Sequence, residues 1–202
     1  MTIDEEIEKF DTQSALLLRF IDELANVDQA SLVQEHFFLA EAITFRLYRI
    51  YESLTRASFL NYCVASATIT GSPVSAKLKC IDWETAEAIL KSGNKFLDWG
   101  NVEAVRGMAN LVFENGFPVV DLVSPVASTL KDLQRFRNFV AHDSSEAAEG
   151  FKKSRTQYIR TGDEPPETVG ALSLYRRNAR SDITIKIIHS RVSGLSTILR
   201  AL

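Results

Sequence analysis

Apolar residues recur every three or four positions along most of this chain, which is the period of an amphipathic α-helix. One such stripe occupies residues 3–26, and a longer one occupies residues 32–67. The longer stripe includes Leu39, Ile43, Leu47, Ile50, Leu54 and Ala57. The pattern predicts two long helices. Gly71-Ser72-Pro73 breaks the second and begins a loop that reaches about residue 81.

Shorter helical segments follow, and several carry recognisable start signals. Ser124-Pro125 combines a preferred N-cap residue with proline at the first helical position, so we expect a helix to begin there. Ile183, Ile185 and Ile187 alternate as in a strand, but the apolar spacing beyond them favours a helix. The further helices are expected over residues 82–90, 101–114, 125–141, 145–159 and 182–202.

These elements predict an all-α fold, a bundle of about six to seven helices around one long central helix. The 202 residues, with 46% apolar and 24% charged side chains, suit a single domain over residues 1–202. Within it, residues 161–170 are expected to form a flexible loop because they contain Gly162, Pro165, Pro166 and three acids. Residues 171–202 form the C-terminal helical segment.

Two features indicate the cellular compartment. The N-terminus is acidic and no run of 18 uncharged apolar residues occurs, so we expect neither a signal peptide nor a membrane span. Cys63 and Cys80 are the two cysteines, and we expect both to be free thiols in a reducing, cytoplasmic environment. No glycine-rich phosphate loop and no zinc-ligand spacing is present, so neither a metal nor a cofactor is expected.

Charge is unevenly distributed along the chain. The formal net charge is −3, but residues 131–202 carry 13 Lys and Arg against 8 Asp and Glu, whereas residues 1–130 are acidic. A basic region concentrates polyanions near it. Solvation of helix faces explains the same imbalance, and the sequence leaves both interpretations open.

The segment that carries candidate chemistry is Arg137-Asn138-Phe139-Val140-Ala141-His142. Around it Val126, Leu130, Leu133, Phe136 and Val140 form one helical stripe. Arg137 falls within this apolar stripe, where a permanent cation requires a partner, an interface or an anionic ligand. His142 titrates near neutral pH and is suited to proton transfer.

On an unbroken helix, Arg137 and His142 point about 140° apart. Either the helix ends near residue 141 and brings His142 round, or two copies of the helix meet and share one cleft. Asn138 precedes His142 by one turn and is placed to orient its imidazole. Each residue also has a simpler, structural interpretation. Arg137 would form a salt bridge with a buried acid such as Glu52, and His142 would be a cation that stabilises the C-terminal end of the helix.

The string Arg-Asn-x-x-Ala-His resembles the signature of the HEPN superfamily, small all-helical proteins of which many are metal-independent endoribonucleases. The strict match covers residues 137–142, and a looser likeness of helix order covers about residues 30–145. The resemblance implies RNA as substrate, a composite site across a homodimer, and a role in toxin–antitoxin or anti-phage defence with a cognate antitoxin or sensor. One HEPN subgroup has a modified tyrosine two residues after the histidine; here that residue is Ser144.

In the expected chemistry, His142 transfers the proton, Arg137 stabilises the charged phosphorane, and Asn138 completes the catalytic set. RNA-binding candidates are Lys131, Arg135, Lys152, Lys153 and Arg155. A set of tyrosines and arginines on the long helix is also suited to nucleic acid, although a half-buried core edge suits its helical spacing better. That set is Tyr48, Tyr51, Tyr62, Arg46, Arg49 and Arg56. The competing function is a non-catalytic HEPN-fold module that dimerises or binds a partner.

Overall fold

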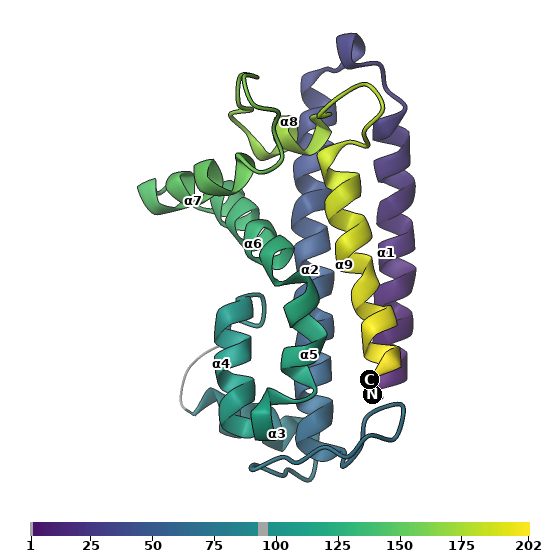
Figure 1. Cartoon of the computed structure of the whole chain (residues 1–202), viewed down its shortest axis with the longest axis vertical. Coiled ribbons are helices and arrows are strands. Elements are labelled where there is room, and N and C mark those ends of the chain that lie inside the picture. The colour runs from purple at the N-terminus through teal and green to yellow at the C-terminus, as the bar shows by residue number, and fades with distance from the viewer. Residues whose placement is uncertain (1, 93–96) are drawn as a thin grey trace. The chain divides into compact units, whose positions relative to one another are not determined.

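The computed structural model describes residues 2–92 and 97–202, and in these ranges the chain is all-α, as predicted (Figure 1). The β-structure found there consists of isolated bridges, such as the one between Arg176 and Ile183, and forms no strand. No helix of the described residues is both long enough and apolar enough to cross a lipid bilayer.

The two long helices lie close to where the apolar stripes place them. Helix α1 spans Ile3–Ala25 and α2 spans Gln34–Val64, joined through a short 3₁₀ turn at Gln29–Ser31. The stripe of α2 is buried at Ile43, Leu47, Ile50, Leu54 and Ala57, each at most 4% exposed. Leu39 is the exception at 40% exposed, and its neighbour Ala40 is fully buried instead.

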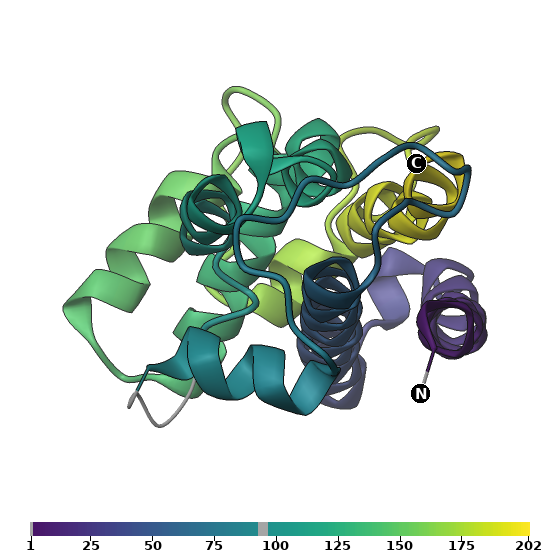
Figure 2. The same ribbon diagram turned by 90° about the horizontal axis from the view of Figure 1, so that it is seen from below.

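Contacts divide the chain into two compact units, which we describe separately. Unit 1 comprises residues 1–11, 50–127 and 193–202, and unit 2 comprises residues 12–49 and 128–192. The long helices α1, α2 and α9, which spans Thr184–Ala201, each have residues in both units. In each unit, segments of these three helices run side by side (Figures 1 and 2).

Unit 1 adds the shorter helices α3, Trp83–Lys91, and α4, Val102–Val112. Both begin at a capping side chain: the Asp82 carboxylate accepts from the amide of Thr85 at 2.7 Å, and Asn101 accepts from two amides of α4. An aromatic cluster fills the core, with Phe59 of α2 5.3 Å from Trp99 and 5.1 Å from Phe113 between ring centroids.

The expected helix start at Ser124-Pro125 was wrong. The chain is already helical from Val119, in α5 (Val119–Val123), and continues through a 3₁₀ turn at Ser124–Val126 into α6 (Ala127–Ala141). Ser124 has helical backbone angles and its side chain makes no capping bond. Burial of Val119, Leu122 and Val123 supports this additional turn and outweighs the local start signal.

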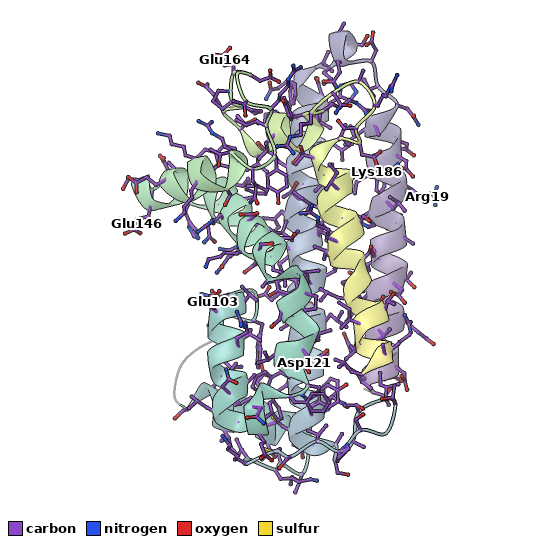
Figure 3. All side chains as sticks on the ribbon, viewed as in Figure 1. Arg19, Glu103, Asp121, Glu146, Glu164 and Lys186 are labelled. Atoms are coloured by element: carbon purple, nitrogen blue, oxygen red, sulfur yellow. The ribbon has the colours of Figure 1, made fainter. Side chains whose placement is uncertain are left out.

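Unit 2 contains the remaining helices: α6, α7 (Ser145–Arg155), α8 (Val169–Leu174) and the first part of α9. Lys186 of α9 joins α1 through an ion pair with Asp22 at 2.8 Å, and Figure 3 marks Lys186 beside α1. Deeper in this unit, the imidazole of His189 lies 3.0 Å from the hydroxyl of Ser14 and 2.9 Å from its carbonyl. α9 is thereby fixed to α1.

The short helix α8 was not predicted, because residues up to 170 were assigned to a loop. Gly170, its second residue, packs so closely on α2 that a Cβ there would lie 2.4 Å from the carbonyl oxygen of Phe37. The Gly170 amide donates to the Glu41 carboxylate at 3.1 Å. A glycine is therefore required at this crossing, and it fixes the orientation of Glu41 on α2.

Candidate functional site

The site forms where α6 ends. The amide of His142 donates to the carbonyl of Asn138 at 2.9 Å, which is the last helical bond after Ala141. Ser144 then has an extended backbone (φ −134°, ψ 150°), and its hydroxyl accepts from the amide of Ala147 at 3.2 Å. Because the N-cap of α7 follows so closely, the chain must change direction directly after His142.

Arg137 and His142 of a single chain meet at this helix end. Nη1 of Arg137 lies 3.3 Å from Nε2 of His142. The helix ends near residue 141, as the first of the two arrangements considered above requires. The 140° divergence describes the directions of the Cα–Cβ bonds on a continuous helix, whereas the long arginine side chain curves round the helix end.

The chemistry of the guanidinium sets the direction of the hydrogen bond between these two side chains. A guanidinium donates hydrogen bonds and cannot accept them, so Nε2 of His142 is the acceptor. His142 is solvent-exposed. Its Nε2 is occupied by Arg137 in this arrangement, and it becomes free to accept a proton only when the guanidinium turns away from it.

Arg137 is partly buried against aromatic rings. Its guanidinium carbon lies 5.9 Å from the ring centroid of Phe45 and 5.8 Å from that of Tyr48, both on α2. Nη1 also donates to Oδ1 of Asn138 at 2.9 Å. Nε is buried and has no hydrogen-bond partner among the described residues. A buried donor without a partner is costly, and an anion at this place would accept from it.

Asn138 was expected to orient the imidazole, and the structure gives its side chain a different contact. Its Oδ1 accepts from Arg137, while its backbone carbonyl accepts from the amide of His142. Asn138 therefore fixes the guanidinium beside the imidazole. The three residues form one connected cluster at the end of α6.

Packing against α7 fixes the end of α6. The rings of Phe139 and Phe151 stack with centroids 4.5 Å apart and planes inclined by 9°. Asp132 of α6 is 3% exposed and accepts from the hydroxyl of Tyr158 at 3.0 Å and from the amide of Gln157. Burial raises the pKa of the Asp132 carboxyl, and burial together with that carboxyl raises the pKa of Tyr158.

The five RNA-binding candidates do not gather round this cluster. Arg135 points to α7, where it donates to Ser154 at 3.0 Å and lies 3.7 Å from Asp132. Arg155 donates to the carbonyl of Pro166 at 2.6 Å and covers the ring of Phe151. Lys152 and Lys153 are exposed on α7, whose first turn also carries the outward-pointing Glu146 (Figure 3). Lys131 is half-buried on α6.

An open groove of about 560 Å³ lies beside the cluster and was not predicted. It is lined by Phe38, Glu41, Ala42, Phe45, Arg46 and Arg49 of α2 and by Val140 of α6. Their spacing along α2, residues 38, 41, 42, 45, 46 and 49, is a single helix face and is visible in the sequence. The sequence analysis grouped Arg46 and Arg49 with the tyrosines of α2, favoured a core edge for the whole set, and did not separate this face from the buried one.

The other candidate groups lie in the core or in ion pairs. Tyr48, Tyr51 and Tyr62 are at most 3% exposed, which confirms the core interpretation of these tyrosines, and Arg56 pairs with Glu87 at 2.5 Å.

Cys63 and Cys80 are free and buried, and burial raises the pKa of Cys63 to about 12. In the parts of the chain that the structure describes, no three His, Cys, Asp or Glu residues are grouped to hold a metal ion.

Comparison of the chain with protein-family models, curated proteins and solved structures found no significant match. The HEPN resemblance therefore depends on residues 137–142 and on the order of the helices, and it stays a prediction.

Proposed function

We propose that this protein is a metal-independent endoribonuclease whose catalytic groups are Arg137 and His142, positioned by Asn138. The observation that carries the proposal is the 3.3 Å contact between the guanidinium and an exposed imidazole. A permanent cation beside an imidazole is the pair that cleavage of a phosphodiester by an internal hydroxyl requires.

In the proposed reaction, Nη1 of Arg137 turns from Nε2 of His142 to the phosphate, and the freed Nε2 takes the proton of an RNA 2′-hydroxyl. The 2′-oxygen attacks the adjacent phosphorus, the new 2′-O–P bond replaces the P–O5′ bond, and the leaving 5′-oxygen receives a proton from water. Arg137 donates to the non-bridging oxygens through the N–H groups of its guanidinium. The products are a 2′,3′-cyclic phosphate and a 5′-hydroxyl.

The proposal has a second part, which concerns assembly and biological role. A homodimer would place two exposed His142 side chains near one axis, so that one accepts the proton and the other donates it. The contact within one chain removes the geometric need for a second copy but does not conflict with this arrangement. We propose the role of a toxin or defence effector controlled by a partner protein.

A non-catalytic binding module is the second candidate function, and one observation favours it. Phe38 and Val140 of the groove are 61% and 42% exposed, and exposed apolar side chains beside a cleft often mark a protein interface. In this case Arg137 and His142 would serve only to stabilise the end of α6. The two functions differ in whether purified protein cleaves RNA.

The test uses purified full-length protein and total cellular RNA, with and without EDTA. We expect cleavage that EDTA does not reduce, and a loss of about 10²–10⁴-fold in rate for His142→Ala. Asp143→Ala, at the next exposed position, is the matched control and should retain wild-type cleavage. Absence of wild-type cleavage, equal cleavage by a folded His142→Ala variant, or restoration by Mg²⁺ after EDTA would each contradict the proposal.

A further inference from the structure

The groove on α2 combines aromatic and charged side chains in an arrangement that the proposed chemistry does not use. Phe38 and Phe45 are separated by seven residues, so they lie two turns apart on the same face of the helix, with Ala42 between them. Val140 of α6 forms part of the wall. The volume of about 560 Å³ lies within the range of about 300–1,000 Å³ typical of small-ligand sites.

The charged groups of the groove indicate what kind of group fits. Glu41 places a carboxylate in the lining, held by the amide of Gly170 at 3.1 Å. A carboxylate repels phosphate but accepts hydrogen bonds from the N–H groups of a nucleobase. Arg46, whose guanidinium lies 3.4 Å from Oε1 of Gln13, is exposed on the same face. Arg49 also lines the groove, so the lining carries one carboxylate and two guanidinium groups. It suits a flat neutral group that bonds to Glu41 while its own phosphates lie toward the arginines.

The groove is connected to the cluster through one aromatic ring. Phe45 lines the groove, and the guanidinium carbon of Arg137 lies 5.9 Å from the centroid of that ring. Arg137 itself has a buried Nε without a hydrogen-bond partner among the described residues. An anion held by Arg137 would thus lie on the side of the groove that Phe45 lines.

We propose that this groove binds an unpaired nucleobase of the RNA, stacked on Phe38 and Phe45, next to the phosphate held by Arg137. This inference rests on the proposed function and adds a binding site for the substrate. Stacking on aromatic side chains tolerates every base, so the groove favours single-stranded RNA over duplex without demanding one sequence. In a duplex the base is paired and cannot enter the groove.

The test measures binding of a fluorescent 12-nucleotide single-stranded RNA to full-length protein carrying His142→Ala, which prevents cleavage. We expect Phe38→Ala to weaken binding about tenfold. Phe38→Tyr retains an aromatic ring and should bind like the parent. Leu111→Ala is the control, because Leu111 is 77% exposed and apolar but belongs to α4 in unit 1.

An abasic oligonucleotide of the same length separates base binding from backbone binding. It should bind the parent more weakly than RNA does, and Phe38→Ala should weaken it no further. Unchanged RNA binding by Phe38→Ala, or an equal loss for RNA and the abasic strand, would overturn the proposal. A halved molecular mass of Phe38→Ala with intact RNA binding would also overturn it, and would make the groove an interface between copies.

Failure of this inference is distinguishable from failure of the proposed function. If wild-type protein cleaves RNA but Phe38→Ala binds normally, the catalytic assignment stands and only the groove assignment is lost. If wild-type protein neither cleaves nor binds RNA, both are wrong.

Discussion

Arg137 is the residue on which the proposed chemistry depends most. One nitrogen, Nη1, reaches both Asn138 and His142, while the guanidinium lies near the rings of Phe45 and Tyr48. A planar fork with several donors meets all of these neighbours and still has donors for a phosphate. A lysine ammonium is a point charge that cannot copy this geometry.

We therefore expect Arg137→Lys to lower the rate of RNA cleavage by about 10²-fold. The melting temperature should fall only slightly, since the positive charge and much of the aliphatic side chain are retained. Cleavage assays and thermal melts on the same preparations measure both effects. Near-wild-type cleavage by Arg137→Lys would show that the cluster needs only a positive charge.

His189 gives a prediction about pH. The ring is 4% exposed, and burial lowers its pKa below the ordinary value of 6.5. The unfolded chain then binds this proton more readily than the folded chain, so stability falls as the pH drops below about 6.5. His189→Gln keeps a donor for the Ser14 carbonyl without the titration.

We expect the melting temperature of the wild type to fall more steeply than that of His189→Gln between pH 7.5 and pH 5.5. These two pH values lie about one unit above and below 6.5, the ordinary pKa of histidine. Parallel melting curves across that range supply the comparison. If the two proteins lose stability equally, buried His189 does not contribute to the acid sensitivity.

At the scale of elements, the end of α6 and the start of α7 together position His142. His142 follows the last residue of α6, and Ser144 caps α7, so one residue separates them. The stacked rings of Phe139 and Phe151 hold the two helices together behind this turn. The turn therefore presents His142 to solvent on a rigid support.

Removal of the cap by Ser144→Ala should reduce the free energy of unfolding by about 0.5–2 kcal/mol. RNA cleavage should stay close to that of the wild type at temperatures well below the melting point, because the hydroxyl bonds to the Ala147 amide of α7. Denaturant unfolding and cleavage assays test the two parts separately. Loss of cleavage in a stable Ser144→Ala protein would assign Ser144 a chemical role.

Much of the element structure was predictable from the sequence, because long apolar stripes dominate it. Helices α1, α2, α3, α4 and α9 lie within a few residues of their predicted ranges. The short helices α5 and α8 were missed because five or six residues show no distinct helical period. Ser124-Pro125 led to a wrong helix start because a local capping signal carries no information about burial of the preceding turn, residues 119–123.

The candidate site was only partly predictable. Its residues follow from one motif, but the meeting of Arg137 and His142 depends on where α6 ends and how a flexible side chain folds back. The groove needed the tertiary structure, since Val140 approaches α2 from a distant part of the chain. Hydrophobic periodicity predicts helices, but it predicts neither the conformation of a long side chain nor contacts between segments far apart in the sequence.

At the scale of the whole molecule, the proposed homodimer is open to direct measurement. One chain has a mass of 22.6 kDa, so sedimentation equilibrium at micromolar concentration should give twice that value. We expect dimerisation because His142 and Val140 are exposed together at the end of α6. A measured mass equal to that of one chain would contradict the proposed homodimer, and any RNA cleavage would then come from the Arg137–His142 cluster of a single chain.

The central claim is that Arg137 and His142 direct an RNA 2′-hydroxyl onto its neighbouring phosphate. The most direct test incubates purified wild-type protein with a single-stranded RNA and with the same sequence in 2′-deoxyribose, and identifies the product ends by mass spectrometry. The account predicts cleavage of the RNA alone, with 2′,3′-cyclic phosphate and 5′-hydroxyl ends that are absent from the His142→Ala reaction. Cleavage of the deoxyribose strand, or RNA products ending in a 3′-hydroxyl, would contradict it.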